Sequence, residues 1–237
     1  MLGALALGVL ALVGGAAAAA VDVTAPPPQV IPQGDLTRTI QKVTFANELA
    51  YYALTYDYQT EAAKPGEASS TWWGWTAGFV PIGMTDPSGC NWYWQAFFTW
   101  EFDDENLANR PATFRVIRSS GPDGMVEFAW DTPKVRAVIR FAMVTGNDKL
   151  LMFGHYEPKV AVQRARLRFS SYPGGFDLPR NRAVTTASGT ATVGQTVQLN
   201  LDRERWFLLE DVTPDNPRQG SAGMVIGTPE SFAGVSI

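Results

Sequence analysis

The chain has 237 residues, of which 19 are Lys or Arg and 23 are Asp or Glu, so its formal net charge is −4 at pH 7. This mild balance, without a polybasic segment, argues against a nucleic-acid-binding protein and against electrostatic attachment to a membrane surface. A single cysteine, Cys90, and a single histidine, His155, exclude an intrachain disulfide and the usual zinc sites.

Residues 1–20 contain no charged side chain and consist almost wholly of Leu, Ala, Val and Gly. The run is short for a membrane span and ends in Ala18-Ala19-Ala20, the small-x-small pattern that signal peptidase recognises. We therefore predict a cleaved signal peptide over residues 1–20 and a mature chain that begins at Val21, although a typical leader also starts with a Lys or Arg. A retained anchor is the alternative. After cleavage we expect no membrane span, and a protein that is secreted or resides in the periplasm or cell envelope.

The region after the leader is rich in proline. Pro26, Pro27, Pro28 and Pro32 predict an extended linker over residues 21–34. From Asp35 onward, short β-branched and aromatic runs alternate with turn residues at even intervals. This pattern is typical of an all-β fold, and we predict a single antiparallel β-sandwich, a jelly roll or a related fold, over residues 35–237 with little helix.

Turn residues between alternating segments predict two hairpins, one from residues 112–118 and 125–130, the other from residues 135–144 and 149–156. Further strands are expected at residues 160–172, 183–186, 196–201, 206–211 and 223–226. The helical candidates are residues 45–54 and one turn at residues 104–109, with Asp103 as its cap.

Tryptophan is concentrated in one part of the chain. Six of the eight tryptophans are Trp72, Trp73, Trp75, Trp92, Trp94 and Trp100. In a strand over residues 92–102, the even positions form a continuous apolar face that is most simply core. The odd face is polar and aromatic. Because sugars combine apolar C–H faces with hydroxyl groups, we predict a glycan site made of Trp72, Tyr93, Gln95 and Glu101. An ordinary solvated sheet face would have the same pattern.

Arg164, Arg166 and Arg168 alternate with apolar residues and so share one strand face. Cross-strand ion pairs are the favoured interpretation, and an anion-binding site is the alternative. Acidic turns at residues 103–106 and 211–216 could supply oxygen ligands to calcium, but neither follows the EF-hand pattern. We therefore predict no metal site and no required cofactor, with calcium as the one candidate.

Enzymatic alternatives remain open, and no catalytic residue is assigned. A glycoside hydrolase would need two facing carboxylates, and a polysaccharide lyase a Tyr or His base beside Arg. The sequence offers the acids Glu101, Asp103, Asp104, Glu127 and Glu157, and for a lyase His155, Tyr156 and the three arginines. No Gly-x-Ser-x-Gly elbow is present.

The leading hypothesis is a glycan-binding or accessory β-sandwich that acts outside the cytoplasm on a glycan or another cell-envelope component. The second is a glycoside hydrolase or polysaccharide lyase. The third is a structural envelope protein with an aromatic protein-contact patch.

Overall fold

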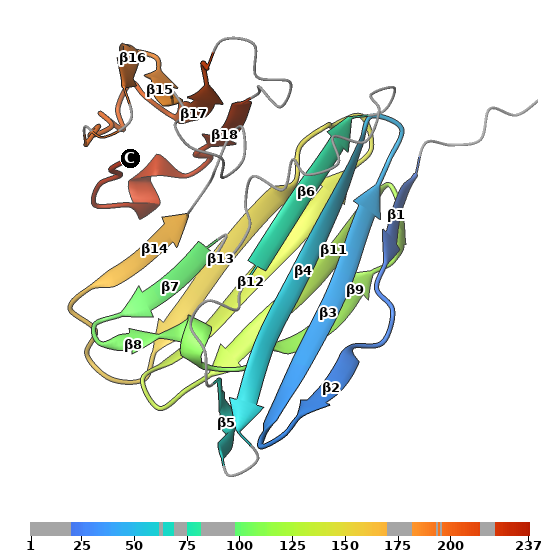
Figure 1. Cartoon of the computed structure of the whole chain (residues 1–237). Helices are drawn as coiled ribbons and strands as arrows, with labels where there is room; N and C mark the ends of the chain where they lie inside the picture. Colours follow the sequence, from blue (N-terminus) through green and yellow to red (C-terminus); the bar gives the residue numbers. More distant parts are fainter. Residues whose placement is uncertain are drawn as a thin grey trace, which may run out of the picture.

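The computed structural model describes residues 20–61, 64–68, 75–81, 98–169, 182–192, 194, 196–213 and 221–237. Within these residues the chain is almost entirely β-strand, and every strand pairing is antiparallel (Figure 1). The prediction of an all-β, sandwich-like fold is confirmed. Among the described residues, no helix has the length and apolar character needed to cross a membrane.

The strands form four sheets. Sheet A contains β1 (Val21–Thr24), β2 (Gln29–Gln33), β3 (Leu36–Ala46), β4 (Ala50–Glu61), β5 (Lys64–Ala68), β6 (Trp75–Pro81) and β10 (Ser120–Gly121). Sheet B contains β7 (Phe98–Phe102), β8 (Glu105–Asn106) and β14 (Ala165–Phe169). Sheet C contains β9 (Thr113–Arg118), β11 (Asp123–Asp131), β12 (Val135–Val144) and β13 (Leu151–Pro158). Sheet D contains β15 (Arg182–Thr186), β16 (Gly189–Thr192), β17 (Trp206–Asp211) and β18 (Ser221–Val225). Two 3-10 turns, η1 (Leu107–Asn109) and η2 (Pro229–Ser231), complete the elements.

Sheets A and C form the two layers of the sandwich, and sheet B lies beside β13 along one open side (Figure 1). The three sheets share one core, which includes Phe45 of sheet A, Phe102 of sheet B and Phe128 of sheet C. On β12, buried residues alternate with outward residues such as Arg136 and Arg140. The alternation means that sheet C has one face in the core and one facing solvent.

The two predicted hairpins are present, as β9 paired with β11 and β12 paired with β13. The later strands are present at residues 165–169, 182–186, 206–211 and 221–225. The strand predicted at residues 196–201 is wrong, because its one β-bridge joins Gln198 to Ser236. Two backbone hydrogen bonds between residues 197 and 237 and one between residues 199 and 235 flank that bridge.

Residues 21–34, predicted as a linker, instead contain two strands of sheet A. Strand β1 pairs with both β3 and β10, and its Val21 and Val23 are buried in the core. Strand β2 pairs with β3. Proline is compatible with β2 because an edge strand leaves one side of its backbone unpaired. Burial of the two valines therefore outweighs the extended, solvated conformation that the prolines favour.

The predicted helix over residues 45–54 is also wrong, because those residues belong to β3, β4 and the turn between them. Asn47 organises the turn by accepting hydrogen bonds from the amides of Leu49 and Ala50, both at 2.8 Å. Its Nδ2 donates to the carbonyls of Val144 and Asn147, both at 2.8 Å. These contacts attach the β3–β4 turn to the β12–β13 turn.

The predicted turn near residues 104–109 is present as η1, but Asp103 does not cap it. The Asn106 side chain accepts from the Ala108 amide at 2.9 Å and is the actual cap. Asp103 has a positive φ of 55° and accepts hydrogen bonds from the backbone amides of Gln163 and Arg164. It therefore joins the β7–β8 turn to the segment before β14.

Candidate functional site

Strand β7 separates a core face from a polar face, as the sequence alternation predicts. Trp100 and Phe102 are buried, and both rings contact Tyr156 of β13, at centroid distances of 5.9 and 5.0 Å. Thr99 and Glu101 lie on the opposite face of the strand, because successive side chains alternate. The predicted partners Trp72, Tyr93 and Gln95 lie outside the described residues, as does Cys90.

Glu101 forms an ion pair with Arg166, its direct cross-strand partner on β14. Arg166 donates from Nε at 2.8 Å and from Nη2 at 2.5 Å to the same oxygen, Oε2 of Glu101. The Glu101 side chain is 15% exposed, and its Oε1 has no hydrogen-bond partner among the described residues. One acceptor of this carboxylate therefore remains available beside a fixed guanidinium group.

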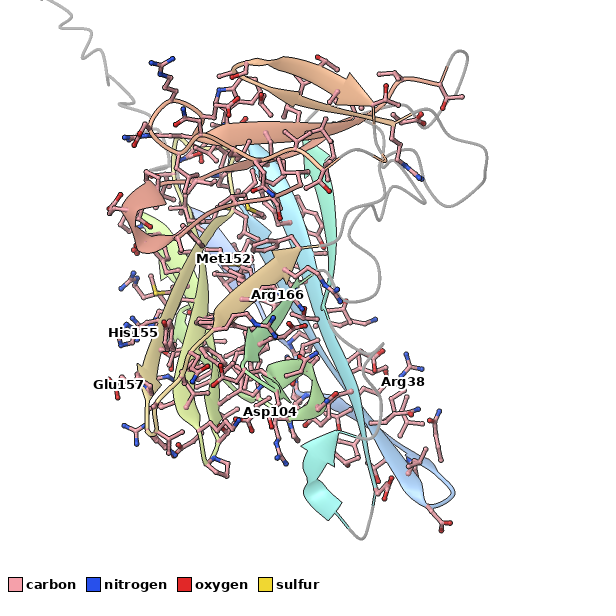
Figure 2. The ribbon with its side chains drawn as sticks, turned by 90° about the vertical axis from the view of Figure 1, so that its left-hand side faces the viewer. Arg38, Asp104, Met152, His155, Glu157 and Arg166 are labelled. Atoms are coloured by element: carbon pink, nitrogen blue, oxygen red, sulfur yellow. The ribbon has the colours of Figure 1, made fainter. Side chains whose placement is uncertain are left out.

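The remaining arginines of the predicted cluster differ in their surroundings. Arg168 is exposed and pairs in register with Thr99, whose hydroxyl is buried and has no hydrogen-bond partner in the described part of the chain. Arg164 precedes β14, and its backbone amide donates to Asp103 at 2.9 Å. The structure therefore brings together Thr99, Glu101, Arg166 and Arg168, and the favoured ion-pair interpretation holds for Arg166. Figure 2 shows Arg166 on β14, a strand of sheet B at the side of the sandwich.

A second polar group lies on the solvent face of sheet C. Glu127 of β11 is flanked in register by Arg115 of β9 and Arg140 of β12. Arg115 Nε donates to Oε1 at 2.6 Å, and Arg140 Nε donates to Oε2 at 2.7 Å. The hydrogen bond from Arg115 is the largest of the effects that lower the pKa of Glu127, and Arg140 acts in the same direction against the effect of burial.

His155 and Tyr156 lie on opposite faces of β13, because they are adjacent strand residues. Tyr156 contacts the rings of sheet B, whereas His155 and Glu157 project from the outer side of sheet C (Figure 2). His155 Nε2 is 3.7 Å from a Glu157 oxygen. The arrangement does not bring both proposed lyase bases beside Arg166.

Two of the five candidate acids of a glycoside hydrolase have partners that favour the ionised form. A hydrogen bond from Lys134 lowers the pKa of Asp104, and the two arginines lower that of Glu127. A general acid needs a raised pKa instead. Within the described part of the chain, no group of three or more His, Cys, Asp or Glu side chains could hold a metal ion.

Sequence reasoning missed the contact between Arg115, Glu127 and Arg140. The missing information is the register of three strands, which no local pattern contains. Comparison with protein-family models, curated proteins and solved structures finds no match to the chain.

Proposed function

We propose that this protein is an exported, noncatalytic glycan-binding protein, and that its site lies on the polar face of β7 and β14. The observation that carries the proposal is the Glu101–Arg166 pair, in which one oxygen of a fixed carboxylate accepts no hydrogen bond from a described residue. Arg168 adds donors on the same face. Carboxylate and guanidinium groups together supply the acceptors and donors that sugar hydroxyls require.

Aromatic stacking completes the proposed site. We place Trp72 and Tyr93 as the rings on which sugars stack, and Gln95 as a further hydrogen-bonding partner. Stacking on two rings and a few hydrogen bonds give weak binding, so the expected dissociation constant is roughly micromolar to millimolar. The lowered pKa values of Glu127 and Asp104 support binding without hydrolysis.

The test is a titration of soluble neutral and acidic oligosaccharides, followed by tryptophan fluorescence and calorimetry. We expect weaker binding in Arg168→Ala, Glu101→Gln and Trp72→Ala, while Arg203→Ala, an exposed arginine near sheet D, serves as the matched control. Products are analysed in the same samples. Release of shorter sugars that Glu101→Gln abolishes would support the enzyme hypothesis. If no oligosaccharide binds, the polar face is a protein-contact surface instead.

Export is tested separately by sequencing the N-terminus of the protein from its natural compartment. We expect a mature chain that begins at or within a few residues of Val21. Cleavage there leaves β1 intact, since β1 starts at that residue. An intact Met1 on a cytoplasmic protein contradicts the proposed localisation.

A further inference from the structure

The solvent face of sheet C carries a row of four side chains, one from each strand. Phe153 of β13 faces Arg140 of β12, Arg140 faces Glu127 of β11, and Glu127 faces Arg115 of β9. Since neighbouring strands are about 4.8 Å apart, the row extends across the whole width of the sheet. All four side chains share the face that is opposite to the core residues Phe128 and Phe141.

Glu127 fixes both arginines while leaving their outer donors unused. Its side chain is only 7% exposed, whereas those of Arg115 and Arg140 are 64% and 48% exposed. Each guanidinium group donates through Nε, and no hydrogen bond from an Nη atom of either arginine is present among the described residues. A guanidinium group has five N–H donors, so each arginine has four further donors that make no hydrogen bond to a described residue.

This arrangement differs from an ordinary surface ion pair. Exposed pairs contribute little because two long side chains must be ordered together in water. Here the carboxylate is buried in the sheet surface and is held by both cations, so both planar groups have a defined position. Two positive charges share one negative charge, which leaves an excess of about one positive charge. Oriented guanidinium groups recognise planar or tetrahedral oxyanions through paired hydrogen bonds.

We propose that Arg115 and Arg140 bind a carboxylate or sulfate group of an acidic polysaccharide, and that Phe153 provides the ring on which a sugar stacks. Phe153 is 52% exposed and is next to Arg140 in register, so an apolar surface and a cation are adjacent. The class of ligand rests on the proposed function, but the residues and the face of the molecule are different.

The charges next to the arginine pair limit where an anion can bind on this face. Arg136 lies on the same face of β12, four residues before Arg140, a separation of about 14 Å at about 3.4 Å per residue. Its ion pairs with Asp131 and Glu157 are long, at 3.9 and 3.8 Å. Arg136 is therefore compensated by two carboxylates, and the uncompensated positive charge of this face lies at Arg115 and Arg140. An acidic polysaccharide could place one anionic group there and extend along the exposed face, which has no enclosed anion site among the described residues.

The experiment compares three probes: oligogalacturonate, which carries carboxylates, a heparin oligosaccharide, which carries sulfates, and an uncharged cello-oligosaccharide. We expect at least one acidic probe to bind more tightly than the uncharged probe, with an affinity that falls as salt is added. Arg115→Ala and Arg140→Ala should each weaken that binding about tenfold, the change expected for one charge-assisted hydrogen-bonding group. Arg203→Ala is the matched control.

Two further variants test the geometry. Arg140→Lys keeps the charge but loses the planar fork, so we expect it to weaken binding too. Phe153→Ala removes an exposed ring without emptying the core, and it should weaken binding several-fold while the melting temperature stays unchanged. Binding of oligogalacturonate alone identifies a carboxylate, binding of heparin alone a sulfate, and binding of both the shared oxyanion chemistry.

The proposal is overturned if neither acidic probe binds, or if Arg115→Ala and Arg140→Ala bind like Arg203→Ala. Wild-type affinity in Arg140→Lys also contradicts it, because charge without orientation is then sufficient. Arg168→Ala separates this site from the β7–β14 site. If an acidic probe still binds Arg168→Ala but no longer binds Arg115→Ala, the result supports this inference alone. If only the uncharged probe binds, and Arg168→Ala abolishes that binding, the result supports the proposed function alone.

Discussion

At the scale of single residues, Trp100 connects sheet B to the edge of sheet C. Its ring is buried, lies against Tyr156 and Phe102, and occupies the space left by Gly154. A β-carbon added at Gly154 would be 3.3 Å from the Trp100 ring, so the glycine permits the close approach of β13 to β7.

We predict that Trp100→Ala lowers the free energy of unfolding by about 3–5 kcal/mol, because it removes a buried ring and leaves a cavity. Trp206→Ala, at a partly exposed position in sheet D, should cost much less. Equilibrium denaturation of both variants measures the difference. Equal losses would mean that Trp100 does not hold sheet B in place.

Glu204 is a buried carboxylate that organises sheet D. Its oxygens accept hydrogen bonds from the Thr186 hydroxyl at 2.7 Å, the Ser188 amide at 3.2 Å and the Asn200 amide at 2.8 Å. Hydrogen bonds from Ser188, Asn200 and Thr186 lower the pKa of Glu204 from 4.5 to about 2. The ionised form is therefore preferred in the folded protein.

The sign of the pH dependence follows from this lowered pKa. The stabilisation from Glu204 is fully present above pH 4.5, the ordinary pKa of the unfolded carboxyl, and is lost as the pH falls towards about 2. We expect the melting temperature of sheet D to fall as the pH is lowered from 4.5 to about 2. Glu204→Gln should be less stable at neutral pH and should lose this part of the dependence. Identical acid profiles in both proteins would assign the loss to other carboxyl groups.

At the scale of elements, β1 and β11 approach closely because β11 has a glycine at the contact. A β-carbon added at Gly124 would overlap Val23 and would be 2.8 Å from Val21 Cγ1. Both valines are buried, so they have no space into which to move.

We therefore predict that Gly124→Ala destabilises the protein by about 1–3 kcal/mol, the usual cost of overpacking a core. The control is Gly227→Ala, since a β-carbon there would meet nothing within 4 Å. Chemical denaturation of the two variants gives the comparison. A neutral Gly124→Ala would indicate that β1 is displaced at little cost, as the predicted linker would be.

The elements that sequence reasoning found are those whose determinants are adjacent along the chain. The β12–β13 hairpin has alternating residues on both sides of a turn at Gly146, which has a φ of 71°. The segment at residues 45–54 has apolar residues at spacings that fit either helix or strand. What decides for strand is the turn at Asn47, whose hydrogen-bond partners lie 97 and 100 residues further along the chain.

The candidate site, too, was predictable from the sequence only in part. Opposite charges on Glu101 and Arg166 made a cross-strand pair a reasonable expectation, and alternation correctly put Trp100 in the core. The contact of Arg115 and Arg140 with Glu127 depends on the register of β9, β11 and β12 together. A bulge in β9 shifts that register between Met125 and Val126, and no residue pattern indicates it.

At the scale of the whole molecule, the main hydrophobic core cluster of the described residues does not include sheet D. The main core cluster runs from Val21 to Met143, and the partly buried residues packed on it end at Phe169. Sheet D has its own buried side chains, among them Val184, Leu199 and Ile226. Figure 1 shows sheet D beyond the end of β14, apart from the two layers of the sandwich. The prediction of one domain over residues 35–237 is therefore open to a direct test.

We predict two unfolding transitions, since cooperativity requires a shared core and the main cluster contains no sheet D residue whose burial the structure describes. Trp100→Ala should lower the transition of the sandwich alone. Glu204→Gln should lower that of sheet D alone, because its hydrogen bonds join residues 186, 188 and 200. Differential scanning calorimetry of the mature chain and the two variants resolves the transitions. One transition that both variants shift equally would show that the sandwich and sheet D unfold as a single cooperative domain, as the sequence predicts.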